Sequence, residues 1–120
     1  MRLKSDLVGV LLAATDERLD TVELDWDRRT ALGVVVAAHG YPATPRLGDL
    51  IGGLPQLPVY GEVQVFHAGT KHSEAGELVS TGGRILCVTA LAQTVKAAQM
   101  HAYAVVDQIK IEGSQYRTDI

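Results

Sequence analysis

The stretch LVSTGGRILCVTA, residues 78–90, is the part of the sequence that decides the fold class. It contains two runs rich in β-forming residues, 78–81 and 84–90, separated by Gly82 and Gly83. Two glycines between such runs predict a hairpin, because a two-residue primed turn requires positive φ. We therefore expect residues 78–90 to form two neighbouring antiparallel strands.

Further strands are expected on the N-terminal side of this stretch. The run ALGVVVAA, residues 31–38, is apolar and rich in Val, which predicts a strand buried on both faces. It ends at HGYP, residues 39–42, where Gly and Pro interrupt regular structure. Residues 63–68 predict another strand, and residues 71–76 predict a turn.

A helix is expected at each end of the chain. Thr94 can cap a C-terminal helix, whose apolar residues repeat at helical spacing: Val95, Ala98, Ala102, Val105 and Ile109. The same spacing predicts an N-terminal helix that already runs at Met1 with no capping residue: Leu3, Leu7, Val10 or Leu11, and Ala14. This order predicts an α+β fold with a mainly antiparallel sheet flanked by the two helices.

Length, composition and charge limit the kind of protein. A chain of 120 residues forms one domain at most, and 47% hydrophobic with 21% charged residues is typical of globular proteins. The net charge of −3 argues against nucleic-acid binding, and no stretch is apolar enough for a membrane span. Cys87 is the only cysteine, so no internal disulfide can form. We expect a cytoplasmic protein, without a cleavable leader, with Cys87 in its core.

Residues 16–27 carry six acidic side chains against one base, Arg18. This pattern predicts a solvated link, held to the core by its apolar residues: Leu19, Val22, Leu24 and Trp26. An acidic partner surface or a metal site is the alternative.

Few residues could carry chemistry. The four histidines lack the spacing of a zinc site, Cys87 lies in the middle of an expected strand, and no serine lies in a G-x-S-x-G motif. Neither common glycine-rich phosphate loop is present. We therefore expect no catalytic, cofactor-binding or metal-ligating residue in this chain.

The candidate binding feature is TGGR, residues 81–84. Exposed amides of Gly82 and Gly83 can form a concave anion site, and the Arg84 guanidinium can hold a phosphate with paired donors. The alternative is an ordinary hairpin turn with a solvated Arg84.

Six strings, taken in order, resemble those of the glycinamide ribonucleotide synthetase (phosphoribosylamine–glycine ligase) family. A seventh, MRLKSDLV at residues 1–8, resembles the start of the helix that follows the family's last metal-binding strand. The six are WD (26–27), VVVAAHGYP (34–42), GDLIGGL (48–54), VFHAGTK (65–71), TGGRILCVTAL (81–91) and YRTDI (116–120). His39 and Thr118 depart from the family's pattern, which has glycine and arginine there. The resemblance covers essentially the whole chain.

The resemblance implies the C-terminal domain of an ATP-grasp ligase, with a half-barrel-like sheet. Such ligases join glycine to 5-phosphoribosylamine through a glycyl phosphate, with ATP converted to ADP and phosphate. ATP and Mg²⁺ (or Mn²⁺) would be bound by segments absent from this chain: the ATP-grasp domain would hold the metal, and an N-terminal domain would carry a glycine-rich substrate loop. Residues 1–18 would be a helix continuing from the ATP-grasp domain, and residues 19–120 the C-terminal domain. This segment alone should be inactive.

The resemblance also implies a role for the candidate feature. In related ATP-grasp enzymes the corresponding hairpin approaches the substrate that is not the nucleotide, so Gly82, Gly83 and Arg84 are expected to border the phosphoribosylamine site. The alternative function is a free-standing, non-catalytic binding or interaction module derived from this domain.

Overall fold

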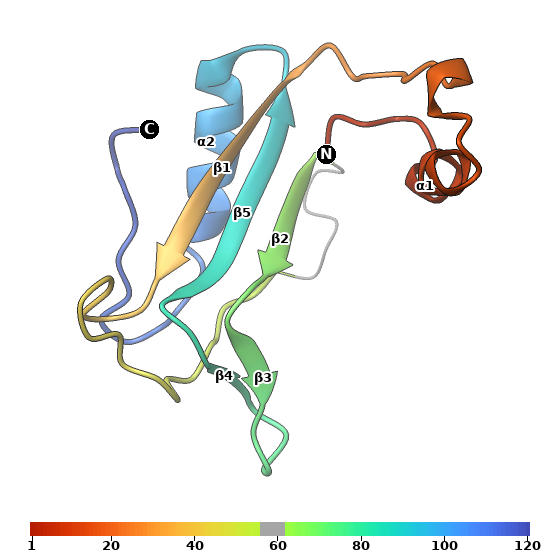
Figure 1. Ribbon diagram of the computed structural model, residues 1–120. Helices are drawn as coiled ribbons and strands as arrows, with labels where there is room; N and C mark the ends of the chain where they lie inside the picture. Colours follow the sequence, from red (N-terminus) through yellow and green to blue (C-terminus); the bar gives the residue numbers. More distant parts are fainter. Residues whose placement is uncertain (56–61) are drawn as a thin grey trace.

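The computed structural model describes residues 1–55 and 62–120 (Figure 1). Its elements, in chain order, are α1 (Leu7–Thr15), the 3₁₀ turn η1 (Leu19–Thr21), β1 (Thr30–Ala37), β2 (Val63–His67), β3 (Thr70–His72), β4 (Leu78–Ser80), β5 (Arg84–Ala92) and α2 (Val95–Val106). The predicted α+β class is confirmed. Within the described ranges, no helix is long and apolar enough to cross a membrane.

The centre of the molecule is a three-stranded antiparallel sheet in the order β1-β5-β2. Helix α2 packs on one face of it, as Figure 1 shows from the opposite side. Thr94 caps α2 as predicted, because its hydroxyl oxygen accepts a hydrogen bond of 3.1 Å from the Ala97 amide. The core lies between sheet and helix, and its most buried members include Val34, Val36, Val63, Ile85, Leu86, Val88, Ala98, Ala102 and Val105.

Strand β1 is buried on one face only, so the prediction of burial on both faces is wrong. Val34 and Val36 point to α2 and are 0% and 2% exposed, whereas Val35 between them is 41% exposed. Side chains alternate along a strand, and one helix covers one face of a sheet. Cys87 pairs with Val35 and lies half-buried on the open face rather than in the core.

The predicted hairpin around Gly82 and Gly83 is also wrong. Strand β4 pairs with β3, while β5 pairs with β1 and β2, so β4 and β5 belong to different sheets. The chain instead forms one long bent hairpin, with β2 and β3 on one side and β4 and β5 on the other. Its turn follows β3, where the Ser73 amide donates to the Glu77 carbonyl at 2.7 Å. The bend is a bulge: residues 81–85 lie opposite only residues 68–69, between the pairs His67–Leu86 and Thr70–Ser80.

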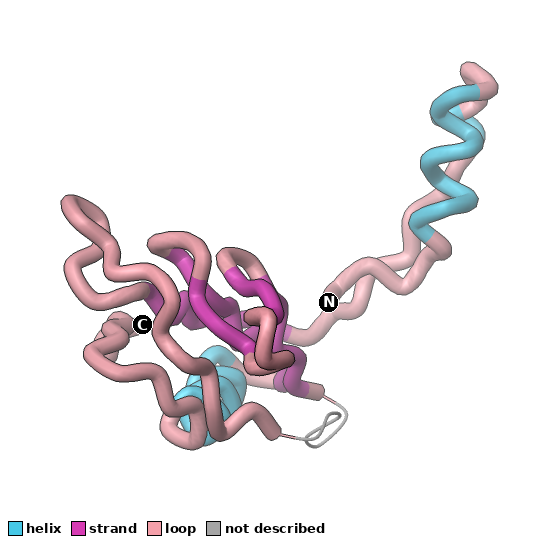
Figure 2. Tube along the Cα trace, turned by 90° about the horizontal axis from the view of Figure 1, so that it is seen from below, coloured by secondary structure: helices cyan, strands magenta, loops and turns pink. Residues whose placement is uncertain are grey.

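The N-terminal residues form an arm that projects from the sheet (Figures 1 and 2). The predicted helix start at Met1 is wrong: α1 begins at Leu7, and the Asp6 carboxylate caps it by accepting from the Val8 and Gly9 amides. Leu3 lies outside the helix and forms a β-bridge with Trp26. The arm therefore consists of a short capped helix carried on two extended segments.

The acidic link does not reach the core through the predicted anchors. Leu19, Leu24 and Trp26 are each about half exposed (53%, 45% and 50%). Val22 is partly buried but is not among the residues that pack against the core. The link is fixed instead by charge, because the Arg29 guanidinium binds Asp27 at 2.6 Å and also binds Glu62. Hydrogen bonds from the Arg29 side chain and backbone hold the pKa of Asp27 well below its usual range. This cluster joins the arm to the first residues of the sheet.

Candidate functional site

The residues of the predicted site, Gly82, Gly83 and Arg84, lie in the bulge where the two sheets meet. A methyl group on Gly83 would come within 2.5 Å of the Tyr41 ring, and one on Gly69 within 2.8 Å of Gly82. The bulge needs glycines for close packing rather than for positive φ, because neither Gly82 nor Gly83 has a positive φ. The glycines of this segment therefore mark a place where neighbouring segments pack too closely for larger side chains.

The backbone of the bulge leaves donors available for a ligand. The Gly83 carbonyl accepts from the Ala38 amide at 2.8 Å, and the Thr81 amide donates to the Gly69 carbonyl at 2.8 Å. Within the described residues, the amides of Gly82 and Gly83 have no acceptor. Two such amides in a bend can donate to an anion.

Arg84 differs from the arginines that have structural partners. Arg29, Arg46 and Arg117 each bind a carboxylate. Arg84 is exposed and has neither a hydrogen bond from its side chain nor an ion pair among residues 1–55 and 62–120. It pairs with Ala37 at the end of β1, and directly paired residues share a face of a sheet. Its guanidinium is therefore free to bind an anion beside the open face.

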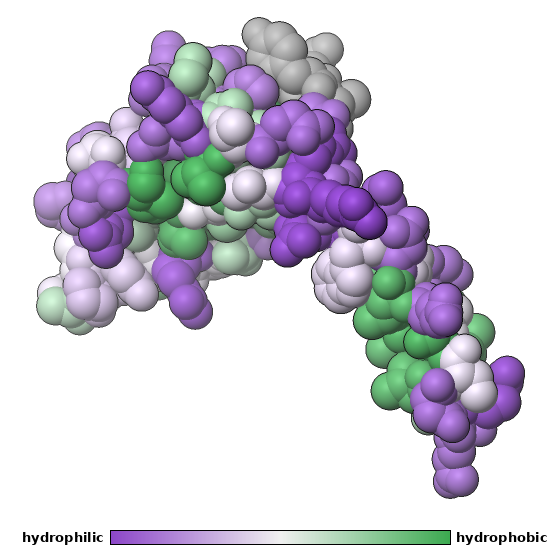
Figure 3. Space-filling view, turned by 90° about the horizontal axis from the view of Figure 1, so that it is seen from above, coloured by the Kyte–Doolittle hydropathy of each residue, from purple (hydrophilic) through white to green (hydrophobic). Residues whose placement is uncertain are grey.

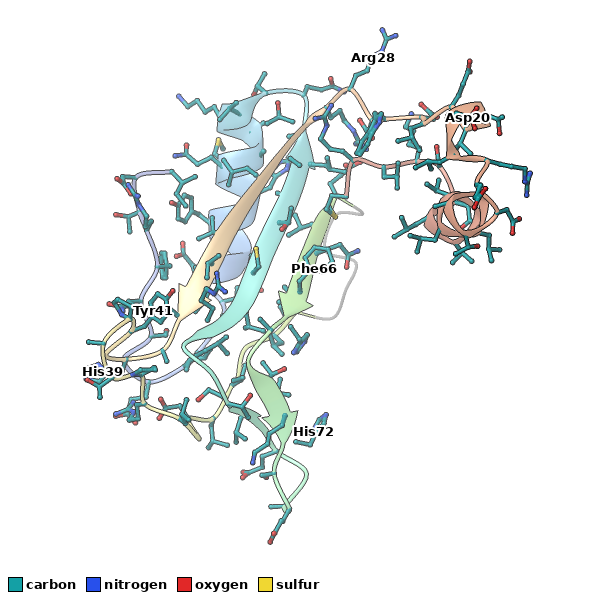
Figure 4. The ribbon with its side chains drawn as sticks, viewed as in Figure 1. Asp20, Arg28, His39, Tyr41, Phe66 and His72 are labelled. Atoms are coloured by element: carbon teal, nitrogen blue, oxygen red, sulfur yellow. The ribbon has the colours of Figure 1, made fainter. Side chains whose placement is uncertain are left out.

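A cavity of about 280 Å³ lies next to this position, lined by Val35, Ala37, Tyr41, Gln115, Tyr116 and Arg117. The C-terminal segment forms its outer wall, because Ala37 and Gln115 exchange backbone hydrogen bonds of 2.8 and 2.9 Å. The side-chain Nε2 of Gln115 donates to the Tyr41 carbonyl at 2.6 Å. Figure 4 shows Tyr41 beyond the end of β1. The cavity therefore lies between two distant parts of the chain, residues 35–41 and residues 115–117.

The remaining cavity groups are held by their own partners. The Tyr116 hydroxyl donates to Asp107 at 3.2 Å, which raises the pKa of Tyr116. Arg117 binds Asp119 with a bond of 2.8 Å, which raises the pKa of the guanidinium and lowers that of the carboxyl. These pairs fix the wall and leave Arg84 as the unpaired cation beside the cavity, among the residues that the structure describes.

The two departures from the family's strings are His39 and Thr118. His39 is exposed beside the Tyr41 loop, and a methyl group on Gly113 would come within 3.0 Å of its ring. Thr118 is exposed in the C-terminal segment. Neither position lines the cavity.

Several candidate groups are not brought together. No three His, Cys, Asp or Glu residues within the described ranges come close enough to hold a metal ion. His67 and His72 bind Thr70 and the Gly76 carbonyl instead. This part of the chain therefore does not fit a resident Mg²⁺ ion.

Reasoning from spacing did not find Tyr41, Gln115 or Arg117 as neighbours of the bulge. Tyr41 and Gln115 lie more than 70 residues apart along the chain, and they are brought together by the pairing of Ala37 with Gln115 and by the hydrogen bond from the Gln115 side chain to the Tyr41 carbonyl. Their one signal in the sequence is that Tyr41 and Arg117 lie in two of the strings, VVVAAHGYP and YRTDI.

Comparisons with known proteins give a consistent result. A family model described as "Phosphoribosylglycinamide synthetase, C domain" matches residues 31–120. The chain is 56% identical over 99% of its length to a phosphoribosylamine–glycine ligase of Ralstonia nicotianae, and 52% identical over its full length to one of Vibrio vulnificus. A crystal structure of the Thermotoga maritima ligase superposes on 92% of the chain with a TM-score of 0.74 and 33% identity. The chain spans only 28% of the two bacterial relatives and 27% of the Thermotoga chain.

Proposed function

The chain belongs to the family of phosphoribosylglycinamide synthetase C domains, and on this premise we propose that it is the C-terminal part of a phosphoribosylamine–glycine ligase. The observation that carries the proposal is the 56% identity with a ligase of that name over 99% of this chain. The complete enzyme joins glycine to 5-phosphoribosylamine in purine biosynthesis.

The reaction needs parts that lie outside these 120 residues. ATP phosphorylates the glycine carboxylate, the phosphoribosylamine nitrogen attacks the resulting glycyl phosphate, and phosphate leaves. ATP and Mg²⁺ (or Mn²⁺) are bound by segments of the ligase outside this chain, with the metal held in the ATP-grasp domain. The sequence has no phosphate loop, and the described residues have no metal-ligand cluster. The domain's contribution is to bind and enclose substrate, because an acyl phosphate hydrolyses in a wet site.

Within that enzyme, Gly82, Gly83 and Arg84 border the phosphoribosylamine site. Three features support this: the unpaired amides of the bulge, an Arg84 guanidinium without a carboxylate partner among the described residues, and the neighbouring cavity. An arginine and two amides together suit the phosphate group of the substrate.

Steady-state kinetics of the complete ligase test this role. Arg84→Ala should raise the KM for phosphoribosylamine about 10- to 100-fold, as expected for losing one charge-assisted contact, and leave the KM for ATP nearly unchanged. Arg28→Ala is the matched control, because Arg28 is exposed at the opposite end of the sheet (Figure 4). A complete chain that forms no glycinamide ribonucleotide refutes the ligase assignment. An unchanged KM for the amine in the Arg84→Ala variant refutes only the role of Arg84.

The division of the chain follows from the same proposal. Residues 1–18 belong with the ATP-grasp domain and residues 19–120 form the C-terminal domain. The family match from residue 31 and the projecting arm support a division near this point. The ligase is cytoplasmic, which suits a chain whose single cysteine cannot form an internal disulfide.

The segment alone is inactive in this proposal. The purified 120-residue chain should neither hydrolyse ATP nor form product, and measurable turnover would contradict this. Inactivity of both this chain and the complete protein would favour the alternative, a non-catalytic interaction module.

A further inference from the structure

The open face of the three-stranded sheet lacks the polar surface that a solvent-facing sheet normally has. Apart from Arg84 at the bulge and the buried Leu91, its outward positions are Ala31, Gly33 and Val35 on β1, Gln64 and Phe66 on β2, and Cys87 and Thr89 on β5. None of these seven residues is charged. An antiparallel sheet that faces water usually places polar or charged residues at such positions, whereas the centre of a protein interface is depleted of charge.

The most apolar part of this face is one row across all three strands. Val35 pairs with Cys87, and Cys87 pairs with Phe66, so the three side chains lie next to one another. Val35 and Phe66 are 41% and 48% exposed. Figure 4 shows Phe66 on β2, at the edge of the sheet. This row, Val35–Cys87–Phe66, is here called the apolar row.

Helix α1 is a second apolar surface without a partner. Leu7, Val8, Leu11 and Leu12 are all more than half exposed. Figure 3 shows apolar side chains grouped on the middle of the arm, between its hydrophilic tip and its hydrophilic base. A helix that is apolar on several sides is typical of a buried helix rather than a surface one.

The two surfaces lie on the same side of the molecule. Figure 2 shows α2 on one side of the sheet and the arm extending away on the other, so α1 and the open face lie on the same side of the sheet. The arm also makes the chain extended, with a radius of gyration of 17.0 Å. A compact domain of this length would have about 14 Å.

We propose that the open face of the sheet, centred on the apolar row, is covered in the complete ligase by the same body that packs on α1. The proposal rests on the proposed function, because its occupant is the part of the ligase that this chain lacks. The relatives have most of their length outside the matching region, since the chain spans 28% of them. One body seated between arm and sheet buries both apolar surfaces and fixes the cavity and Arg84 against the rest of the enzyme.

Thiol accessibility in the complete ligase tests the proposal. Single variants Phe66→Cys, Leu11→Cys and Met100→Cys are treated with N-ethylmaleimide under native conditions, and labelling of each peptide is followed by mass spectrometry. Met100 is the matched control, because it is an apolar residue 63% exposed on α2, on the other side of the sheet. Labelling in urea gives the intrinsic reactivity of each thiol. Val35→Cys replaces Phe66→Cys if the latter does not fold.

We expect the Phe66→Cys and Leu11→Cys thiols to react at least tenfold more slowly than the Met100→Cys thiol in the native ligase. Rapid labelling of the Phe66→Cys thiol overturns the proposal, even if the Leu11→Cys thiol is protected. Protection that disappears on dilution also overturns it, because the covering body is then a second copy. Product formation is measured in parallel to separate this result from the ligase assignment. An active enzyme with a reactive Phe66→Cys thiol refutes only the proposal that the open face is covered.

Discussion

The two faces of the three-stranded sheet are made from the same strands but have different environments. Val34 and Val35 are neighbours on β1, yet Val34 is fully buried under α2 and Val35 is exposed on the open face. The side chains are chemically identical, so their composition cannot account for the difference. What differs is that one helix is available to cover one face. The same substitution at these two positions should therefore change the free energy of unfolding by different amounts.

The largest effect on stability should come from the face of the sheet that α2 covers. Val34→Ala should lower the free energy of unfolding by about 2–3 kcal/mol, because it removes buried methyl groups and leaves a cavity. Val35→Ala on the same strand should cost less than about 0.5 kcal/mol in this chain. Urea unfolding monitored by circular dichroism measures both. Equal losses would show that the open face is also packed within the 120 residues.

The bulge beside the open face should show a smaller effect. Gly69→Ala should cost about 1–2 kcal/mol, because the added methyl group would meet the backbone of Gly82 and Arg84 within 3 Å. Gly82→Ala is the control: its methyl group would have one neighbour, at 3.4 Å. The same urea titration compares them. If both variants are tolerated, the junction is looser than the structure shows.

The ion cluster at the other end of the sheet should matter in a pH-dependent way. Arg29 lowers the pKa of Asp27 in the folded state. The ion pair therefore stabilises the fold at neutral pH, and this stabilisation is progressively lost as the pH falls below about 4, the pKa of an Asp side chain in the unfolded chain. Asp27→Asn should therefore lower the urea midpoint at pH 7 and have less effect at pH 3. A pH-independent difference between the two proteins would contradict the role of this charge.

Arg84 should show the smallest effect on stability. Because its side chain is exposed and has no partner among the described residues, Arg84→Ala should change the free energy of unfolding of this chain by less than about 0.5 kcal/mol. Differential scanning calorimetry of the purified chain measures it. A loss of 1 kcal/mol or more would make Arg84 part of the packing at the bulge rather than a free binding group.

Elements with local signals were predicted correctly. The capped helix after Thr94 and the strands near residues 31–38, 63–68, 78–81 and 84–90 all form. The strand ends are shifted by one or two residues, whereas the helix ends at Val106, three residues before the predicted Ile109. Each has a local physical cause, such as a capping hydroxyl, apolar spacing or a run of β-branched residues. Strand β3 was not expected, because its three residues, Thr70–His72, are too few to give a pattern.

The candidate site was predicted only in part. The TGGR segment was identified from its glycines and its arginine, but they were assigned to a hairpin turn. The structure places them in a bulge, where Gly69 and Tyr41 come close to Gly82 and Gly83. Glycine is required both by positive φ and by close packing, and a sequence does not distinguish the two requirements.

By itself, then, the sequence determined the α+β class, the family and the residues of the local elements, because these depend on spacing and short strings. Only the tertiary structure decided which strands pair, which face of β1 is open, and that Tyr41, Gly83, Arg84 and Gln115 meet at one end of the sheet. Those features depend on contacts between residues far apart in the chain. A single helix that covers one face of the sheet decides that identical side chains such as Val34 and Val35 have opposite environments.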